Sequence, residues 1–368
     1  MTSTATKPGT AVVPTTQEIL QFTYPDTVYK RDVVWSGGIN TDAESRRSIV
    51  SPGFILLGID SYYYNLSTSS VLDLNTAGNW NSSETTYATA ANRAGKDVYI
   101  YLCSGSGDTL NIVLSCDSSF PDDYTALTSR QIGGFHCLCV SAGATPGDAL
   151  ASHPAANYLA GDIIPNSVWD LLFRSHGDNI GEAWIEELGI WTDIYMLSSG
   201  GSVYTGNPLN QNWEDTADSL AVRKKKFLND YQFQIVAARS NEETNIHGSA
   251  DVSSAGGHLD TDSKRMISKY FLEECCGYLN QWLSDTTAKY DGAVTAGYVD
   301  LGGSSTPVAE KGSSYLPVDT NEIKLLAGGH WNNAAACGSR SRCAGYSRSN
   351  ATSNFGARGC SDPRIVNL

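Results

Sequence analysis

The chain has 368 residues, of which 41% are hydrophobic and 17% are charged, and its formal net charge is −14. This length allows two or three domains with large cores, and the acidic balance argues against a nucleic-acid-binding protein. No apolar run approaches the roughly 18 residues of a membrane-spanning helix, and the first residues, MTSTATKPGTAVVPTT, lack the apolar region of a signal peptide.

The first half of the chain predicts β-structure. Residues 1–55 mix Pro, Thr, Val and Tyr without a clear period, and we interpret them as an N-terminal arm or a small attachment or oligomerisation segment. Runs rich in β-branched and aromatic residues then alternate with turn clusters, which favours an antiparallel sheet or sandwich. We therefore predict a β-sandwich domain over residues 56–165. Its expected strands include residues 54–60, 97–103, 110–116 and 133–140.

The second half, residues 166–368, predicts a mixed domain, so the expected fold class is α+β. Residues 167–173 and 190–197 have the composition of strands. A short helix is expected over residues 220–228, with the basic run Arg223–Lys226 on its solvated face. A second helix is expected to follow, with Asn229 as its N-cap and Gln232 completing a capping box.

The sequence contains few signs of catalytic chemistry. The six histidines are scattered, and the chain has no HExxH, GxSxG or P-loop motif. Glu273 and Glu274 are expected to be an exposed pair, and the nine cysteines to be mostly buried thiols. We therefore predict no enzyme, no cofactor and no metal. The alternative is a thiol redox or copper site formed by Cys337 and Cys343, which lie close in sequence within a glycine-rich frame.

The most unusual segment is the C-terminal block GGHWNNAAACGSRSRCAGYSRSNATSNFGARG, residues 328–359. Glycine and aromatic residues frame it, and small and polar residues fill it. Such a segment is typical of a displayed surface that a scaffold holds in place. The residues predicted to form this scaffold are Gly328, Gly329, Trp331, Trp282, Phe355, Gly356 and Arg358.

Three segments, in the right order, resemble the formylglycine-generating-enzyme type of C-type lectin fold. FLNDYQFQIVAAR (227–239) resembles a helix of that fold, and SKYFLEECCGYLNQWLSD (268–285) resembles its central segment. GGHWNN and FGARG, at the two ends of residues 328–359, resemble its closing motifs. The resemblance implies a C-type lectin domain over residues 166–368, and an oxidase of this type is one alternative function.

A closer resemblance is to phage tropism determinants, which are variable proteins of diversity-generating retroelements. It rests on SSFPDDYTALTSRQIGGFH (118–136), SVWDLLFR (167–174), WTDIYML (191–197) and the FGARG ending. It covers about residues 97–368, and residues 328–359 align without a gap. The first 55 residues do not obviously match the β-prism of that family.

This resemblance implies a set of display positions. In that family, error-prone copying of template adenines changes Asn codons of the AAC type at surface positions only. The positions that correspond in this chain are His330, Asn332, Ala334, Ala336, Cys343, Gly345, Tyr346, Asn350, Thr352 and Asn354.

Two features of the sequence agree with these positions. The four positions from His330 to Ala336 have period two, so an extended segment would place them on one face with Trp331 turned inward. Adenine mutation of AAC cannot produce Lys, Glu, Gln, Met or Trp, and none of these occurs at the ten positions.

The predicted function is host attachment by a viral tail-tip or fibre protein. The resemblance implies a host cell-surface protein or glycan as the ligand, a homotrimer, a virion location, and no nucleic-acid partner. Tyr and Asn side chains would supply contacts of the kind found in antibody paratopes. A third hypothesis is a purely structural tail or baseplate protein.

Overall fold

The structure is a computed structural model. It describes residues 2–4, 34–35, 46–50, 55–59, 62–66, 71–106, 109–146, 153, 155–170, 181–287, 297–300, 313–316 and 323–363. In this part of the chain no helix is long and apolar enough to cross a membrane.

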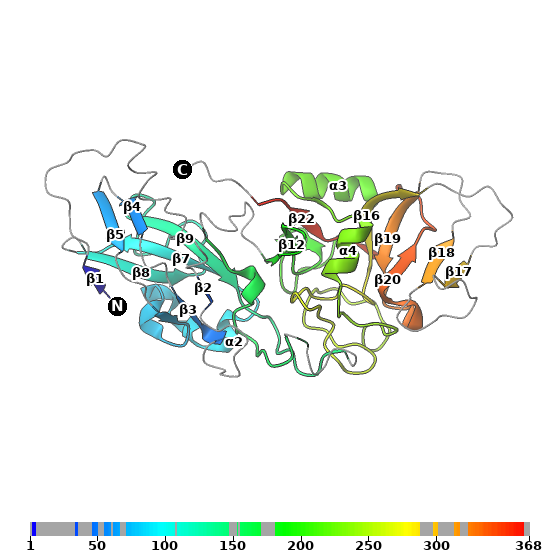
Figure 1. Cartoon of the computed structure of the whole chain (residues 1–368), viewed down its shortest axis with the longest axis horizontal. Helices are drawn as coiled ribbons and strands as arrows, with labels where there is room; N and C mark the ends of the chain where they lie inside the picture. The colour runs from blue at the N-terminus through cyan, green and yellow to red at the C-terminus, as the bar shows by residue number, and fades with distance from the viewer. Residues whose placement is uncertain are drawn as a thin grey trace. The chain divides into compact units, whose positions relative to one another are not determined.

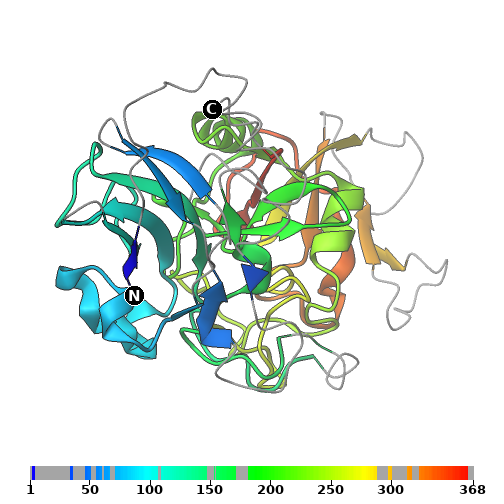
Figure 2. The ribbon, with the colours of Figure 1, turned by 60° about the vertical axis from the view of Figure 1, so that its left-hand side comes forward.

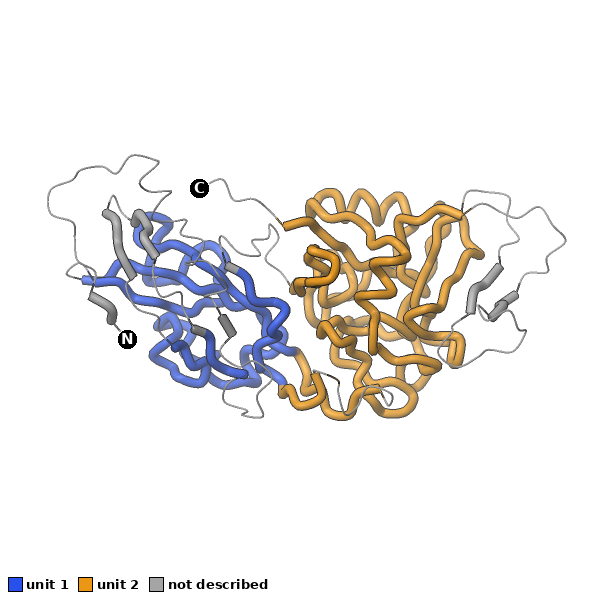
Figure 3. The backbone as a smooth tube through the Cα atoms, viewed as in Figure 1, with its two compact units in different colours: residues 1–138, 160–179, 364–368 blue, residues 139–159, 180–363 orange. Residues whose placement is uncertain are grey.

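The chain divides into two compact units (Figure 3). Unit 1 comprises Met1–Leu138, Ala160–Asn179 and Arg364–Leu368, and unit 2 comprises Cys139–Leu159 and Ile180–Pro363. This division differs in detail from the expected boundaries after residues 55 and 165, because the segment 139–159 groups with the second unit. The three-part division of the sequence stays a prediction.

Unit 1 is built on an antiparallel five-stranded sheet in the order β1-β8-β7-β9-β10 (Figure 1). The strands expected over residues 97–103 and 110–116 are confirmed as β7 and β8. The strand expected over residues 133–140 lies four residues earlier, as β9, and the one expected over residues 54–60 forms β4 of a separate hairpin with β5. Of the strand expected over residues 167–173, the last three residues lie outside the described part. The strands are β1 (Thr2–Thr4), β4 (Ile55–Ile59), β5 (Tyr62–Leu66), β7 (Asp97–Ser104), β8 (Thr109–Ser115), β9 (Ser129–His136) and β10 (Trp169–Asp170).

A small sheet and short helices share a core with this five-stranded sheet. Ile49 of β3 and Leu72 of β6 belong to the same buried cluster as Ile100 of β7 and Leu114 of β8. Apolar side chains from two sheets thus exclude water from one core, as in a sandwich. The elements are β2 (Val34–Trp35), β3 (Ser48–Val50), β6 (Val71–Asp73), η2 (Ala77–Asn79), η3 (Ser82–Ala88), α2 (Ala90–Arg93) and η5 (Pro165–Ser167).

Unit 2 contains a six-stranded sheet in the order β17-β18-β20-β19-β16-β21 and a four-stranded sheet in the order β11-β12-β22-β15. Most of these strands are labelled in Figure 1, and Figure 2 shows the same ribbon turned by 60°. The strand expected over residues 190–197 forms β12 and then, after a bend, β13. The strands are β11 (Glu182–Ile185), β12 (Ile190–Asp193), β13 (Leu197–Ser198), β14 (Gly201–Ser202), β15 (Lys226–Phe227), β16 (Asn280–Thr287), β17 (Gly297–Asp300), β18 (Ser313–Leu316), β19 (Ile323–Gly328), β20 (Gly338–Cys343), β21 (Phe355–Gly356) and β22 (Gly359–Ser361).

Two α-helices of unit 2 begin at asparagine caps. Asn212 accepts a hydrogen bond from the Asp215 amide at the start of α3 (Trp213–Val222). The capping box of Asn229 and Gln232 is confirmed at the start of α4 (Asp230–Val236). The predicted helix over residues 220–228 is wrong, because α3 ends at Val222 and Lys224 adopts a left-handed backbone conformation with φ of 59°.

Lys225 corrects the prediction of a wholly solvated basic run. Its side chain is 1% exposed, its ammonium lies 2.9 Å from Glu182 Oε1, and it donates to Asp193 Oδ1. Burial lowers the pKa of Lys225, but the charges of Asp193 and Glu182 raise it above its ordinary value on balance. A buried cation needs such partners because it has left water.

The Glu273–Glu274 pair is also corrected, since both residues are fully buried. The Glu273 carboxylate accepts from Arg265 Nη2 at 2.6 Å. The Glu274 carboxylate accepts from the Gly256 amide at 2.9 Å and lies 2.5 Å from His258 Nδ1. The partners come from the long loop that precedes the pair, and the sequence spacing contains no sign of them.

Candidate functional site

The start of β16 is the centre of the candidate binding surface. Residues 278–281, the last two residues before the strand and its first two, lie between two segments of the C-terminal block. On one side Tyr278 forms a parallel β-bridge with His330, and the Trp331 amide donates to the Tyr278 carbonyl at 2.8 Å. On the other side Asn280 pairs with Phe355, and the Asn280 amide donates to the Asn354 carbonyl at 2.9 Å. Two stretches of display positions are thereby brought to one short strand.

Glycines allow the block to approach this strand closely. Gly328 and Gly329 have φ of 91° and 78°, a conformation that side chains with a Cβ rarely adopt. A Cβ on Gly328 would lie 2.5 Å from the Cys275 carbonyl oxygen, and one on Gly329 would lie 2.8 Å from Cys337 Sγ. Both residues are therefore required by space as well as by backbone conformation.

The remaining scaffold residues are buried in the core of unit 2, except Trp331. Trp282 and Phe355 are each 1% exposed, and their rings meet edge to face with centroids 5.0 Å apart. Gly356 packs against Leu279. Trp331 is only half-buried, and its Nε1 is shielded from solvent with no hydrogen-bond partner in the described part of the chain. Its backbone is nevertheless held, because its carbonyl accepts from Asn245.

Arg358 ties the end of the block to three other segments. Its guanidinium donates to the carbonyl oxygens of Asp193, Ile194 and Glu273, and it lies 3.4 Å from Gln281 Oε1. The side chain is 1% exposed. A planar group with five N–H donors can satisfy several carbonyls at once, which a lysine could not do in the same geometry.

The segment that carries His330, Asn332, Ala334 and Ala336 is not extended, so the argument from period two is wrong. The His330 amide donates to Asn333 Oδ1 at 2.8 Å, and the Asn333 amide donates back to the His330 carbonyl at 2.9 Å. A turn of 3-10 helix, η6 (Ala334–Ala336), follows. Asn333 folds the chain into a turn because its short side chain competes for backbone donors.

A second turn of the same construction follows at Ser347–Asn350. The Ser347 amide donates to Asn350 Oδ1 at 2.8 Å, and the Asn350 amide donates to the Ser347 carbonyl at 3.1 Å. Asn350 is a predicted display position, whereas Asn333, which closes the first turn, is not. The side-chain oxygen of Asn350 therefore already accepts a hydrogen bond within its own loop.

The ten display positions differ in exposure. Cys343 is corrected, since it is 5% exposed and packs with Trp282, Leu326 and Phe355. The ring of Tyr346, which is 36% exposed, lies 4.8 Å from that of Phe355. Burial lowers the pKa of His330, so its imidazole favours the neutral form. The exposed positions are Asn332, Ala334, Tyr346 and Thr352, and the partly exposed ones are His330, Ala336, Gly345, Asn350 and Asn354.

The two thiols of the alternative oxidase site are protonated groups in apolar surroundings. Burial raises the pKa of Cys337 to about 12 and that of Cys343 to about 11. All nine cysteines are free, and Cys337 donates weakly to the His330 carbonyl at 3.5 Å. A thiol is nucleophilic or metal-binding as the thiolate, which these environments disfavour. Among the described residues no group of three or more His, Cys, Asp or Glu could hold a metal ion.

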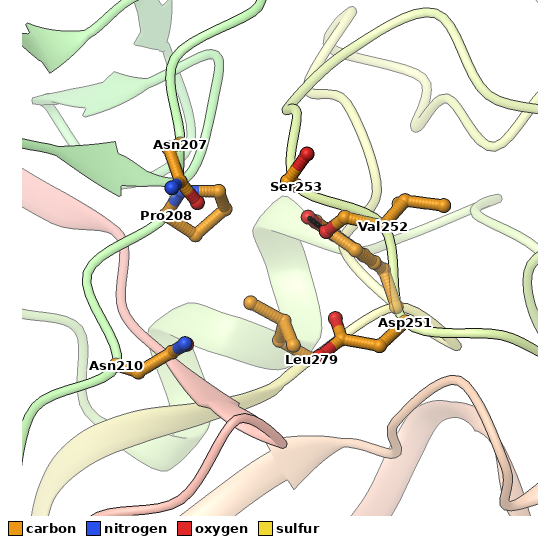
Figure 4. A pocket seen from close by; sticks show the side chains of 8 residues that line it. Asn207, Pro208, Asn210, Asp251, Val252, Ser253 and Leu279 are labelled. Carbon is orange, nitrogen blue, oxygen red and sulfur yellow. Dashed lines mark hydrogen bonds between the residues drawn. The ribbon is translucent and has the colours of Figure 1, made fainter.

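A pocket beside the display surface was not anticipated from the sequence. It has a volume of about 320 Å³, and Leu279 lies at its base (Figure 4). Tyr278 also lines it. Asn207, Pro208 and Asn210 lie on one side of it, and Asp251, Val252 and Ser253 on the other. Both walls come from loops, and the polar composition of these loops is the only sequence signal that could have predicted the pocket.

Comparison with known proteins places this geometry in context. A family model described as "Mtd second domain" matches residues 63–170. The chain is 24% identical to the "Tail fiber receptor-binding protein" of Bordetella phage BPP-1, over 95% of this chain and 94% of that protein. The protein resembles the phage major tropism determinants. This similarity extends over nearly the whole length, and it confirms the resemblance that the sequence motifs predicted.

Solved structures of major tropism determinants share the fold of this chain. The I1 variant superposes with a TM-score of 0.62 at 21% identity, covering 88% of this chain and 82% of that one. The U1 variant gives a TM-score of 0.61 at 21% identity, covering 89% and 83%. The match confirms the predicted α+β class with a C-type lectin fold.

Proposed function

We propose that this protein is a host-attachment protein of a phage or related virus, located at the tail tip or fibre. The main support for this role is that the C-terminal block brings its exposed polar positions to both sides of residues 278–281, while Gly328, Gly329 and Arg358 are buried. The relative in Bordetella phage BPP-1 is named a tail fibre receptor-binding protein, which supports the same role here.

The ligand would be a protein or glycan on the host surface, bound by the exposed display positions Asn332, Ala334, Tyr346 and Thr352. Asn and Thr side chains donate and accept hydrogen bonds, and Tyr346 offers a large amphipathic ring that loses little entropy when it is ordered. No catalytic step is required. Cys337 and Cys343 act as packing groups in this proposal, because burial keeps their thiols protonated.

The identities at the display positions are proposed to change by retroelement mutagenesis of template adenines. The buried frame supports this, because substitutions at Asn332 or Thr352 disturb no hydrogen bond from their side chains to the core. We further propose a homotrimer, since a small surface of this kind gains avidity when several copies bind together. The DNA beside the gene is expected to hold a near-copy of the codons for residues 330–354, next to a reverse transcriptase.

The proposal is tested by adsorption of virus particles to the host. Asn332, Tyr346 and Thr352 are replaced together by alanine, and the fraction of particles bound to cells is measured. We expect attachment to fall by tenfold or more. The matched control replaces Glu186, Asp218 and Val222, which are exposed residues of unit 2 outside the block. Unchanged attachment by the first variant, with the particles intact, would support a purely structural role instead.

A further inference from the structure

The pocket beside the display surface has polar walls and an apolar floor. Figure 4 shows Asn207 and Asn210 on one side, facing Asp251 and Ser253 across the opening. These four side chains offer two carboxamides, a carboxylate and a hydroxyl. The base of the pocket is Leu279, and Pro208 contributes a second apolar surface.

The polar groups of the walls are available to a ligand. Asn207, Asn210, Asp251 and Ser253 are all exposed, and within the described part of the chain none has a side-chain hydrogen bond or ion pair. Carboxamides donate and accept, a hydroxyl does both, and a carboxylate accepts through two oxygens. The pocket can therefore serve several hydroxyl groups at once.

The charge of the lining selects the class of ligand. Asp251 brings a negative charge, and no Lys, Arg or His occurs among the described residues that line the pocket. A phosphate or carboxylate would meet this charge without a cation to compensate it, which is unfavourable where water is partly excluded. A neutral molecule with several hydroxyls would meet only donors, acceptors and an apolar floor.

Hydrogen bonds hold the wall of the pocket that residues 251–253 form. The Tyr278 hydroxyl lies 2.8 Å from the carbonyl oxygens of both Val252 and Ser254, and it donates to one of them at a time. Burial raises the pKa of Tyr278, so the hydroxyl keeps its proton. Glu274 anchors the same loop further along through Gly256 and His258. A pocket of about 320 Å³ is thus preformed, and its size is within the range of small-ligand sites.

The floor of the pocket is continuous with the display surface. Tyr278 bridges His330, and the next residues, Leu279 and Asn280, lie against Gly356 and Phe355. None of the lining residues belongs to the ten display positions, so this part of the surface stays constant while the display positions change.

We propose that the pocket lined by Asn207, Asn210, Asp251, Ser253 and Leu279 is a fixed subsite for a neutral sugar residue of the surface ligand. It rests on the proposed host-attachment function and names the ligand class of one part of that surface. The sugar hydroxyls bind the polar walls, which supply most of the contact, because Leu279 at the base is only 1% exposed and Pro208 is buried. Several copies in an oligomer would make a weak single site effective.

The test measures binding of neutral monosaccharides to the full-length protein by saturation-transfer NMR. The probes are glucose, galactose, mannose, rhamnose, N-acetylglucosamine and N-acetylgalactosamine, at concentrations on the order of 10 mM. N-acetylneuraminic acid and glucuronic acid are the anionic counterparts. We expect at least one neutral sugar to bind and both acids to bind more weakly. Asp251→Ala or Asn210→Ala should weaken that binding by about tenfold or more.

Three controls separate this subsite from the attachment function. Asp218→Ala removes an exposed carboxylate on α3 and should leave sugar binding unchanged. Asp251→Asn keeps the acceptor oxygen and should restore part of the binding. The triple alanine variant at Asn332, Tyr346 and Thr352 should lose host attachment but keep sugar binding.

The outcomes distinguish the two proposals. The subsite is overturned if no neutral sugar binds, if the pocket variants bind as well as the parent, or if the acids bind best. It is also overturned if the pocket variants lose binding to host surface protein that has been stripped of its glycans. Attachment that survives the triple alanine variant contradicts the proposed function instead, and it does so whatever the sugars do.

Discussion

Arg358 and Thr352 lie close together in the sequence, but they belong to two regions with opposite tolerance to change. Arg358 is 1% exposed and donates to carbonyls of Asp193, Ile194 and Glu273. Thr352 is exposed, and its side chain accepts one 3.2 Å bond from the nearby Asn354 amide. The comparison teaches that the bonds a side chain makes to distant segments, rather than its place in the block, decide what a substitution costs.

The largest effect is expected for Arg358→Met. It leaves several buried carbonyl oxygens without a donor, so the free energy of unfolding should fall by about 3–5 kcal/mol. Urea denaturation of the full chain measures this. Arg348→Met is the matched control, since the side chains of its ion pair with Glu214 are 39% and 50% exposed and the pair should contribute about 0.5 kcal/mol. Equal losses for the two arginines would contradict the division into frame and surface.

A smaller loss is expected for Gly328→Ala. The substitution places a Cβ in a left-handed conformation 2.5 Å from the Cys275 carbonyl oxygen. We expect a loss of about 2 kcal/mol, measured by thermal unfolding. Gly78→Ala is the control, because a Cβ there would meet nothing within 4 Å. A Gly328→Ala protein as stable as the parent would show that the close approach at this point is not required.

The turns closed by Asn333 and Asn350 test which residues of the block belong to the buried frame and which belong to the variable surface. Asn333→Ala and Asn350→Ala each remove an acceptor for a backbone amide 2.8 Å away. Each should cost about 1 kcal/mol, and hydrogen exchange of the His330 and Ser347 amides should quicken in the respective variant. If Asn350→Ala changes neither quantity, position 350 belongs with the freely variable surface despite its hydrogen bonds.

At the exposed display positions, substitutions should alter stability least. Asn332→Ala and Thr352→Ala are each expected to change the free energy of unfolding by no more than about 0.5 kcal/mol. The same denaturation measurements used for Arg358 provide the comparison. A large loss at either position would mean that the display surface also supports the fold.

A pH effect of smaller size is expected at His258, which anchors the loop beside the pocket. Burial lowers the pKa of His258, but its hydrogen bond to Glu274 and the charge of Glu274 raise it on balance. The pKa in the folded protein is thus above the unfolded value of about 6.5. The stabilisation is fully present below the unfolded pKa and is lost as pH rises through the folded pKa.

His258→Gln should therefore flatten the stability profile above about pH 6.5. An NMR titration of the His258 ring measures its pKa directly. A His258 pKa below the unfolded value of about 6.5 would contradict the expectation.

The parts of this structure that could be predicted from sequence are those determined by neighbouring residues. The strands at residues 97–103 and 110–116 follow from local composition, and the Asn229–Gln232 capping box follows from a spacing of three. The burial of Lys225 could not be predicted, because its partners Glu182 and Asp193 lie far away in the sequence.

The candidate site shows the same division, with one exception. The buried glycines and aromatic residues of the block could be identified from composition and resemblance, whereas the pocket depends on loops that only the fold brings together. The exception is the segment from His330 to Ala336. The alternation of display positions there favoured a strand. The segment forms a turn instead, because the Asn333 side chain accepts a hydrogen bond from the His330 amide and a 3-10 turn follows.

Tyr278 serves both parts of the surface with different atoms. Its carbonyl accepts from the Trp331 amide, and its hydroxyl bonds to the carbonyls of the Val252–Ser254 loop. Neither bond uses the side chain of a display position. Tyr278 thus helps to fix the position of the constant pocket relative to the changing residues. Members of a population with different display residues would keep the same distance between the two parts of the surface.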